Sequence, residues 1–228
     1  MALRRKNHPG ETRALARPVL ALLLAFCAVT QAVEFAGGLV SDNEGTVTAS
    51  YSSGTVATPR SGGGFVGTNT GVISSCGACS TVICGEYAGG FVSYNGFVVR
   101  GHESLPGEIR DCYSLGMVDG HIMAGGFICL NNATIRRCYS AGAIHSGGEA
   151  GEFLGRNLPQ HETTVEQAYW DMEASSIEVS AAGIGKTTEQ MRQQASFEGW
   201  DFEKVWMICE GKDYPRLRWE GVECDAGD

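Results

Sequence analysis

The residues GGFVGTNTGVI, at positions 63–73, carry a pattern that returns along the chain at a fixed interval and so predicts the architecture. In every copy a glycine stands two residues before a leucine or phenylalanine, at Gly37, Gly63, Gly89, Gly125 and Gly151. The spacings between these glycines are 26, 26, 36 and 26 residues. The longer spacing equals one repeat plus a ten-residue insertion, which falls around residues 98–107.

Other positions keep the same register. Six residues after each of these glycines stands an asparagine: Asn43, Asn69, Asn95, Asn131 and Asn157. Apolar residues form three short clusters per repeat, each too short for a helix. Such a period predicts coils of short strands that stack by parallel hydrogen bonds. We therefore predict an all-β fold, a parallel β-helix or β-solenoid of about five 26-residue coils, in which the asparagines form a ladder.

At these residues the chain resembles a known family. GGFVGTNTGVI and IRRCYSAGAI, residues 135–144, are similar to the GLUG repeat of bacterial surface and secreted proteins, including IgA-specific peptidases. The resemblance covers about residues 35–165 and implies a bacterial cell-surface repeat protein. Two copies depart from the repeat. The second has Cys76-Gly77 in place of Cys-Tyr, and the fifth has Glu152 and Pro159, which mark it as the last coil.

The tail also resembles the Trp-rich segment that often follows such repeats, as in Gly199-Trp200-Asp201-Phe202. All four tryptophans lie after residue 169, whereas 25 of the 32 glycines lie between residues 35 and 155. We therefore predict three parts: a signal peptide over 1–32, GLUG-like repeats over 33–165 and a C-terminal capping module over 166–228. The Trp-rich end is expected to cover the open apolar end of the column.

Further expectations concern this module and the opposite end. The residues from Thr187 to Gln190 predict the capping box of a short helix. Cys209 and Cys224 flank a 14-residue loop, and we predict a disulfide between them. No comparable cap precedes Phe35, so the first coil is expected to dock on a partner or on a second copy, end to end.

The first 32 residues have the pattern of an export signal. Five bases and one acid are followed by an apolar run over residues 19–29 and by a small residue, Ala32. We predict a secreted or cell-surface protein; an uncleaved anchor and a lipoprotein at Cys27 are the alternatives. Without residues 1–32 the chain has 12 bases and 25 acids, a net charge of −13, which argues against a nucleic-acid partner.

No catalytic or metal-binding set emerges from the sequence. His102-Glu103 and His161-Glu162 lack the second histidine of a zinc-protease motif, and Gly185-Lys186-Thr187 lacks the first glycine of a phosphate loop. Glu103, Glu108, Asp111 and Asp119 form the one enzyme-like acidic patch, for which a solvated rim is the preferred interpretation. Three cysteines share one repeat position and predict a row of small buried side chains: Cys76, Cys112 and Cys138.

These observations favour a non-catalytic exported surface or adhesion-type module that binds an extracellular glycan or protein, without a cofactor. The ten-residue insertion is the best candidate contact loop, because functional loops are carried by rigid scaffolds. The alternative is a carbohydrate-active β-helix enzyme or an accessory fragment of a secreted peptidase.

Overall fold

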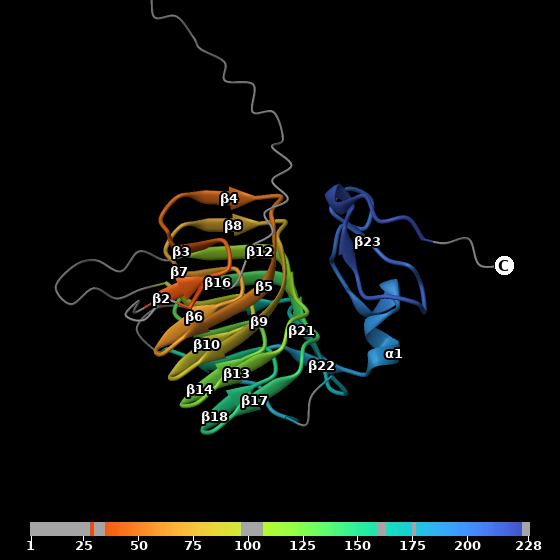
Figure 1. The fold of residues 1–228 in the computed structure, drawn as a ribbon. Helices are drawn as coiled ribbons and strands as arrows, with labels where there is room; N and C mark the ends of the chain where they lie inside the picture. The colour runs from red at the N-terminus through yellow and green to blue at the C-terminus, as the bar shows by residue number, and fades with distance from the viewer. Residues whose placement is uncertain (1–27, 30–34, 97–106, 159–162, 175–176, 225–228) are drawn as a thin grey trace, which may run out of the picture.

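A computed structural model gives the fold and describes residues 28–29, 35–96, 107–158, 163–174 and 177–224. The chain winds into about five coils that stack into a column (Figure 1). The predicted all-β parallel β-solenoid with its 26-residue spacing is confirmed. One short α-helix, α1 (Thr188–Met191), lies in the described part of the chain.

Two walls of the column are five-stranded parallel sheets with one strand from each coil. The glycine sheet consists of β2 (Phe35–Gly37), β6 (Ser61–Gly63), β10 (Tyr87–Gly89), β14 (Met123–Gly125) and β18 (Glu149–Gly151). The asparagine sheet consists of β3 (Val40–Asn43), β7 (Val66–Asn69), β11 (Val92–Asn95), β15 (Ile128–Asn131) and β19 (Leu154–Asn157). Equivalent residues of successive coils are paired, so Gly37 lies beside Gly63 and Asn43 beside Asn69.

The third wall, the long sheet, has twelve strands. They are β1 (Ala28–Val29), β4 (Thr46–Thr48), β5 (Tyr51–Thr58), β8 (Val72–Ser74), β9 (Gly77–Cys84), β12 (Glu108–Ser114), β13 (Val118–Gly120), β16 (Thr134–Ser140), β17 (Ile144–Ser146), β20 (Thr164–Glu166), β21 (Tyr169–Asp171) and β22 (Ile184–Lys186). Each coil bends within this wall at a residue with positive φ: Ala49, Ser75, Asp111, Arg137 and Gln167. Positive φ is uncommon outside glycine, so its return in every coil marks a shared corner.

Ladders of like side chains fill the column. Phe65, Phe91, Phe127 and Phe153 stack with ring centroids 4.7 to 4.9 Å apart and nearly parallel planes. All four are fully buried, beside a ladder of isoleucines from the long sheet. Each stacked pair contributes about 0.5–1.5 kcal/mol beyond its buried area, which favours this one register over its neighbours.

The two glycines at the head of each repeat are required for different reasons. A Cβ at Gly63 would overlap the carbonyl oxygen of Val66 in the same coil. A Cβ at Gly64 would overlap the carbonyl oxygen of Gly90 in the next coil. In the fifth coil the second position is Glu152, whose N–H instead donates to the carbonyl of Val179 at 2.9 Å. The second glycine is therefore needed only where another coil of the repeat follows.

The two ends of the column differ. Residues 177–186 lie across the fifth coil: β22 pairs with β21, and the Ser180 hydroxyl accepts from the N–H groups of Phe153 and Leu154. At the other end β1 pairs with β5, and no described strand lies beyond β2, β3 or β4. β1 falls within the predicted signal peptide, and the remainder of that segment lies outside the described residues.

The predicted capping module, residues 166–228, covers the end of the column through residues 177–186, whereas its Trp-rich part, from Trp200 to Trp219, lies along the side of the column (Figure 1). Its tryptophans pack on tyrosines that point outward from the long sheet. Trp170 is the exception, because it is buried with the phenylalanine ladder. The end needs no further cover, since residues 177–186 already lie over it.

Candidate functional site

A column of tyrosines on the outer face of the long sheet attaches the C-terminal module, defined here as residues 187–224. Tyr113 and Tyr139 stack at 5.4 Å, and both are fully buried beneath Trp206 and Leu217. The column is interrupted at Gly77, where a Cβ would overlap the ring of Tyr113. The departure of the second repeat from Cys-Tyr therefore makes room for a neighbouring tyrosine.

Among the described residues, side-chain hydrogen bonds tie the module to the wall at several points. They join Tyr139 to the Pro215 carbonyl at 2.7 Å, Trp219 to the Ser75 carbonyl at 2.8 Å, Trp200 to the Gln167 carbonyl at 3.1 Å, Tyr113 to the Glu220 carboxylate, and Arg216 to the Tyr113 hydroxyl at 3.4 Å. Ser75 and Gln167 are corner residues of the second and fifth coils. Burial, followed by the adjacent charge of Glu220, raises the pKa of Tyr113 well above its ordinary value, so this hydroxyl stays a donor. The module is thus fixed along most of the length of the column.

A buried carboxylate, Asp171, makes a further attachment. Its oxygens accept from the hydroxyls of Tyr214 at 2.6 Å and Thr188 at 2.8 Å and from the Glu173 N–H at 2.8 Å. Thr188 opens α1, whose predicted capping box between Thr187 and Gln190 is confirmed. The end of the solenoid and the start of the module therefore share one hydrogen-bond centre.

The Glu152 carboxyl group is also buried at this end of the column, where only 2% of the residue is exposed. Burial, and then the negative charge of Asp171, raises the pKa of Glu152 to about 8. The backbone of Ile177 interacts favourably with its charged form and partly offsets this shift. Neither Glu152 nor Asp171 is exposed to a substrate, so the two acids do not form an accessible catalytic pair.

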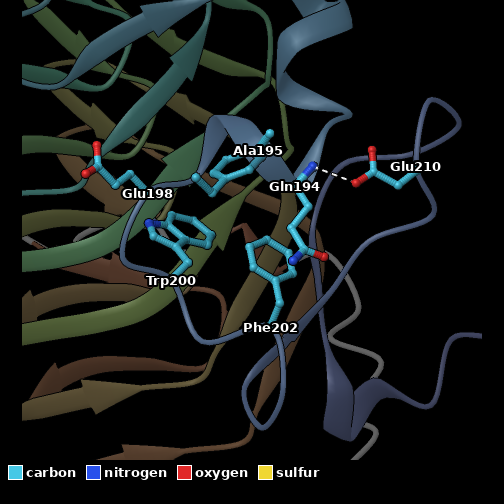
Figure 2. A pocket seen from close by; sticks show the side chains of 7 residues that line it. Gln194, Ala195, Glu198, Trp200, Phe202 and Glu210 are labelled. Carbon is cyan, nitrogen blue, oxygen red and sulfur yellow. Dashed lines mark hydrogen bonds between the residues drawn. The ribbon is translucent and has the colours of Figure 1, made fainter.

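The module carries a pocket of about 630 Å³, within the range of roughly 300–1,000 Å³ typical of small-molecule sites. Its walls combine aromatic rings with polar side chains, which come from Gln194, Phe197, Glu198, Trp200, Phe202 and Glu210. Figure 2 shows Glu198 and Glu210 on opposite sides of the rings of Trp200 and Phe202. Because Phe197 and Trp200 are buried, the half-buried ring of Phe202 is the apolar surface that this arrangement offers between hydrogen-bond acceptors.

Local interactions set the shape of this pocket. Glu210 accepts from the Gln194 N–H at 3.0 Å at the start of a 3-10 turn, Gln194–Ser196. Gly199 has a φ of 77°, and a Cβ there would overlap the side chain of Gln167. The ring of Phe197 lies 4.7 Å from that of Trp200, which is itself bonded to the long sheet. The rigid scaffold thus positions the aromatic wall directly.

The structure brings together the residues predicted to form a ladder and a disulfide. The Nδ2 group of each asparagine donates to Oδ1 of the next along the column at 2.7 to 3.0 Å, through Asn43, Asn69, Asn95, Asn131 and Asn157. Cys209 and Cys224 are joined by a disulfide. These contacts hold the scaffold and the end of the module, and none of them lines the pocket.

The acidic patch is not assembled as an enzyme site. Asp111 is buried and makes two hydrogen bonds with Arg137, at 2.6 and 2.9 Å, between adjacent corners. Glu108 is paired with Arg110 at 3.2 Å, and Asp119 lies apart on β13. Glu103, both His-Glu pairs and residues 97–106 of the candidate contact loop lie outside the described residues.

The cysteine row is confirmed: Cys76, Cys112 and Cys138 are free thiols buried in the core. Burial raises the pKa of Cys112 well above its ordinary value, which keeps this thiol protonated. Cys79 is exposed while Cys76 is buried, so the C-x-x-C pair is divided between the two faces of the wall. Within the described ranges, no group of three or more His, Cys, Asp or Glu side chains is placed to hold a metal ion.

Comparison with known proteins gives no match among family models, curated proteins or solved structures. In the described part of the chain, no helix has the length and apolar character needed to cross a membrane. The pocket was missed at the sequence level, although one signal was present. The tyrosines follow inward-facing cysteines directly and so point outward, and an exposed aromatic column predicts a covering partner.

Proposed function

We propose that this protein is an exported, non-catalytic repeat module of the GLUG type that binds a glycan at the aromatic pocket of its C-terminal module. The pocket itself carries the proposal. It has the size of a small-molecule site, and three aromatic side chains stand beside two carboxylates and one amide. Sugar rings present apolar C–H faces and hydroxyl donors, which suit such walls.

The way the module is held supports the same role. Trp200 is fixed to the Gln167 carbonyl, and its ring lies 4.4 Å from that of buried Trp206. A wall that is already ordered loses little conformational entropy when a ligand binds. The solenoid, on this proposal, acts as a rigid stalk that presents the pocket.

The test pairs a glycan array with an assay for released reducing ends, using the full-length protein. We expect binding without turnover, and weaker binding by Phe202→Ala, whose half-buried ring lines the pocket. Ile83→Ala removes an exposed apolar side chain from the long sheet and serves as the control. Bond cleavage would support the carbohydrate-active alternative, and retention of a protein partner with no glycan bound would replace the glycan with a protein.

Export and assembly belong to the same proposal. We expect residues 1–32 to direct the chain out of the cytoplasm, so that intact mass of the secreted protein gives an N-terminus at Val33. End-to-end association through the first coil stays a prediction, which light scattering at high protein concentration tests. A strict monomer under those conditions would remove it.

A further inference from the structure

We infer that the glycan unit bound in the aromatic pocket carries an ammonium group, as an amino sugar does. The inference rests on the proposed function and adds to it the charge of the ligand. Its basis is that the charged side chains of the pocket lining are all negative and that aromatic side chains lie between them.

The titratable side chains of the lining are all acidic. Glu198 and Glu210 are exposed, and none of the lining residues is lysine, arginine or histidine. Arg218 approaches from outside the lining, but its guanidinium donates to the Phe202 carbonyl at 2.6 and 3.2 Å. The whole chain has a net charge of −9, which adds to the negative potential at the pocket. A cationic ligand is favoured by this field, and a uronic or sialic acid is opposed by it.

The aromatic rings strengthen this preference. The ring of Trp200 lies 6.5 Å from that of Phe202 and at 21° to it, and the ring of Phe197 lies 6.2 Å from Phe202. Phe197 and Trp200 are buried, whereas the ring of Phe202 is half-buried and is the one that a ligand can reach. An ammonium group within about 6 Å of the centroid of that ring is attracted to its face. A neutral sugar does not gain this contribution.

Three monosaccharides of similar shape test the charge directly: glucosamine, glucose and glucuronic acid. Each is titrated into the full-length protein at about pH 6, below the pKa of roughly 7.7–8.0 typical of an α-amino group. Tryptophan fluorescence reports binding. We expect glucosamine to bind most tightly and glucuronic acid least, with affinity for glucosamine falling as salt is added.

Charge-deleting variants locate the effect. Glu198→Gln and Glu210→Gln keep an oxygen acceptor, so the 3.0 Å bond from the Gln194 N–H can persist in the second variant. Each is expected to weaken glucosamine binding about two- to fivefold, as loss of one exposed ion pair does, and to leave glucose binding unchanged. Glu223→Gln removes an exposed acid outside the pocket lining and is the matched control.

The outcomes separate this inference from the proposed function. Equal affinity for all three sugars overturns the ammonium assignment and leaves glycan binding intact. Binding of lysine methyl ester but of no sugar keeps the charge preference and moves the ligand from a glycan to a protein. If none of these four compounds binds, both the inference and the glycan pocket are refuted.

Discussion

Replacing Glu152 by glutamine should remove a large pH dependence from the stability of this protein. The Glu152 side chain is buried, and its pKa is raised from an ordinary 4.5 to about 8. Because the folded-state value is the higher one, the favourable contribution is complete below about pH 4.5 and is lost as the pH rises through 8. At about 1.4 kcal/mol per pKa unit, the full change is on the order of 4–5 kcal/mol. Typical domains have only about 5–15 kcal/mol of stability.

The assay is urea unfolding followed by tryptophan fluorescence, at about pH 5 and pH 9, for the wild type and for Glu152→Gln. Glutamine resembles the protonated side chain, so the two proteins should differ little at the acidic pH. At the alkaline pH the variant should be the more stable by several kcal/mol, because it has no charge to bury beside Asp171.

Glu149→Gln is the matched control. Glu149 lies three residues earlier, its side chain is 59% exposed and it is paired with Arg156, so its removal should change the pH dependence little. The same change in stability from pH 5 to pH 9 in the wild type and in Glu152→Gln would refute the reasoning.

Three further changes test the scaffold. Gly126→Ala should cost about 1–3 kcal/mol or prevent folding, because the new Cβ would overlap a carbonyl oxygen of the next coil. Gly45→Ala is the control, because a Cβ there meets no atom within 4 Å, and equal urea midpoints for the two variants would contradict this reasoning. Asn95→Ala should cost about 1–3 kcal/mol, because it removes the acceptor of one Asn69 N–H and one donor to Asn131, and an unchanged midpoint would remove the ladder as a source of stability. Reduction of the disulfide between Cys209 and Cys224, 15 residues apart, should destabilise the module by about 3 kcal/mol, and a free thiol at either residue in intact-mass analysis would refute the bond.

The repeat made the column predictable, because each coil obeys the same local rules. Gly63 and Gly64 must be glycine because a Cβ at either would overlap a carbonyl oxygen, and Phe65 stacks on the equivalent ring of the next coil, Phe91. The prediction needed only the period, since parallel stacking places each residue beside its copy one repeat away. The sequence also showed that Glu152 replaces the second glycine in the fifth coil, but only the structure explains why this is tolerated: no further coil of the repeat stacks there.

The site could not be predicted in the same way, because it depends on contacts that do not repeat. Trp219 reaches Ser75 across 144 residues, and Tyr139 reaches Pro215 across 76. No spacing in the sequence specifies which side of the column receives the module. The outward tyrosines mark a covered surface, but the pocket forms only once Trp200 is fixed against the long sheet.

The first glycine of each pair makes room for a carbonyl of its own coil and the second for a carbonyl of the next coil, and this difference determines where the solenoid can gain a coil. An additional 26-residue unit inserted before the fifth coil would place its own second glycine against the carbonyl oxygen of Glu152, as Gly126 does now, so a single gene duplication there adds a coil without a steric clash. A unit added after the fifth coil would meet the side chain of Glu152 and residues 177–186. The solenoid can therefore lengthen by insertion of an internal coil, but not by addition of a coil after the fifth.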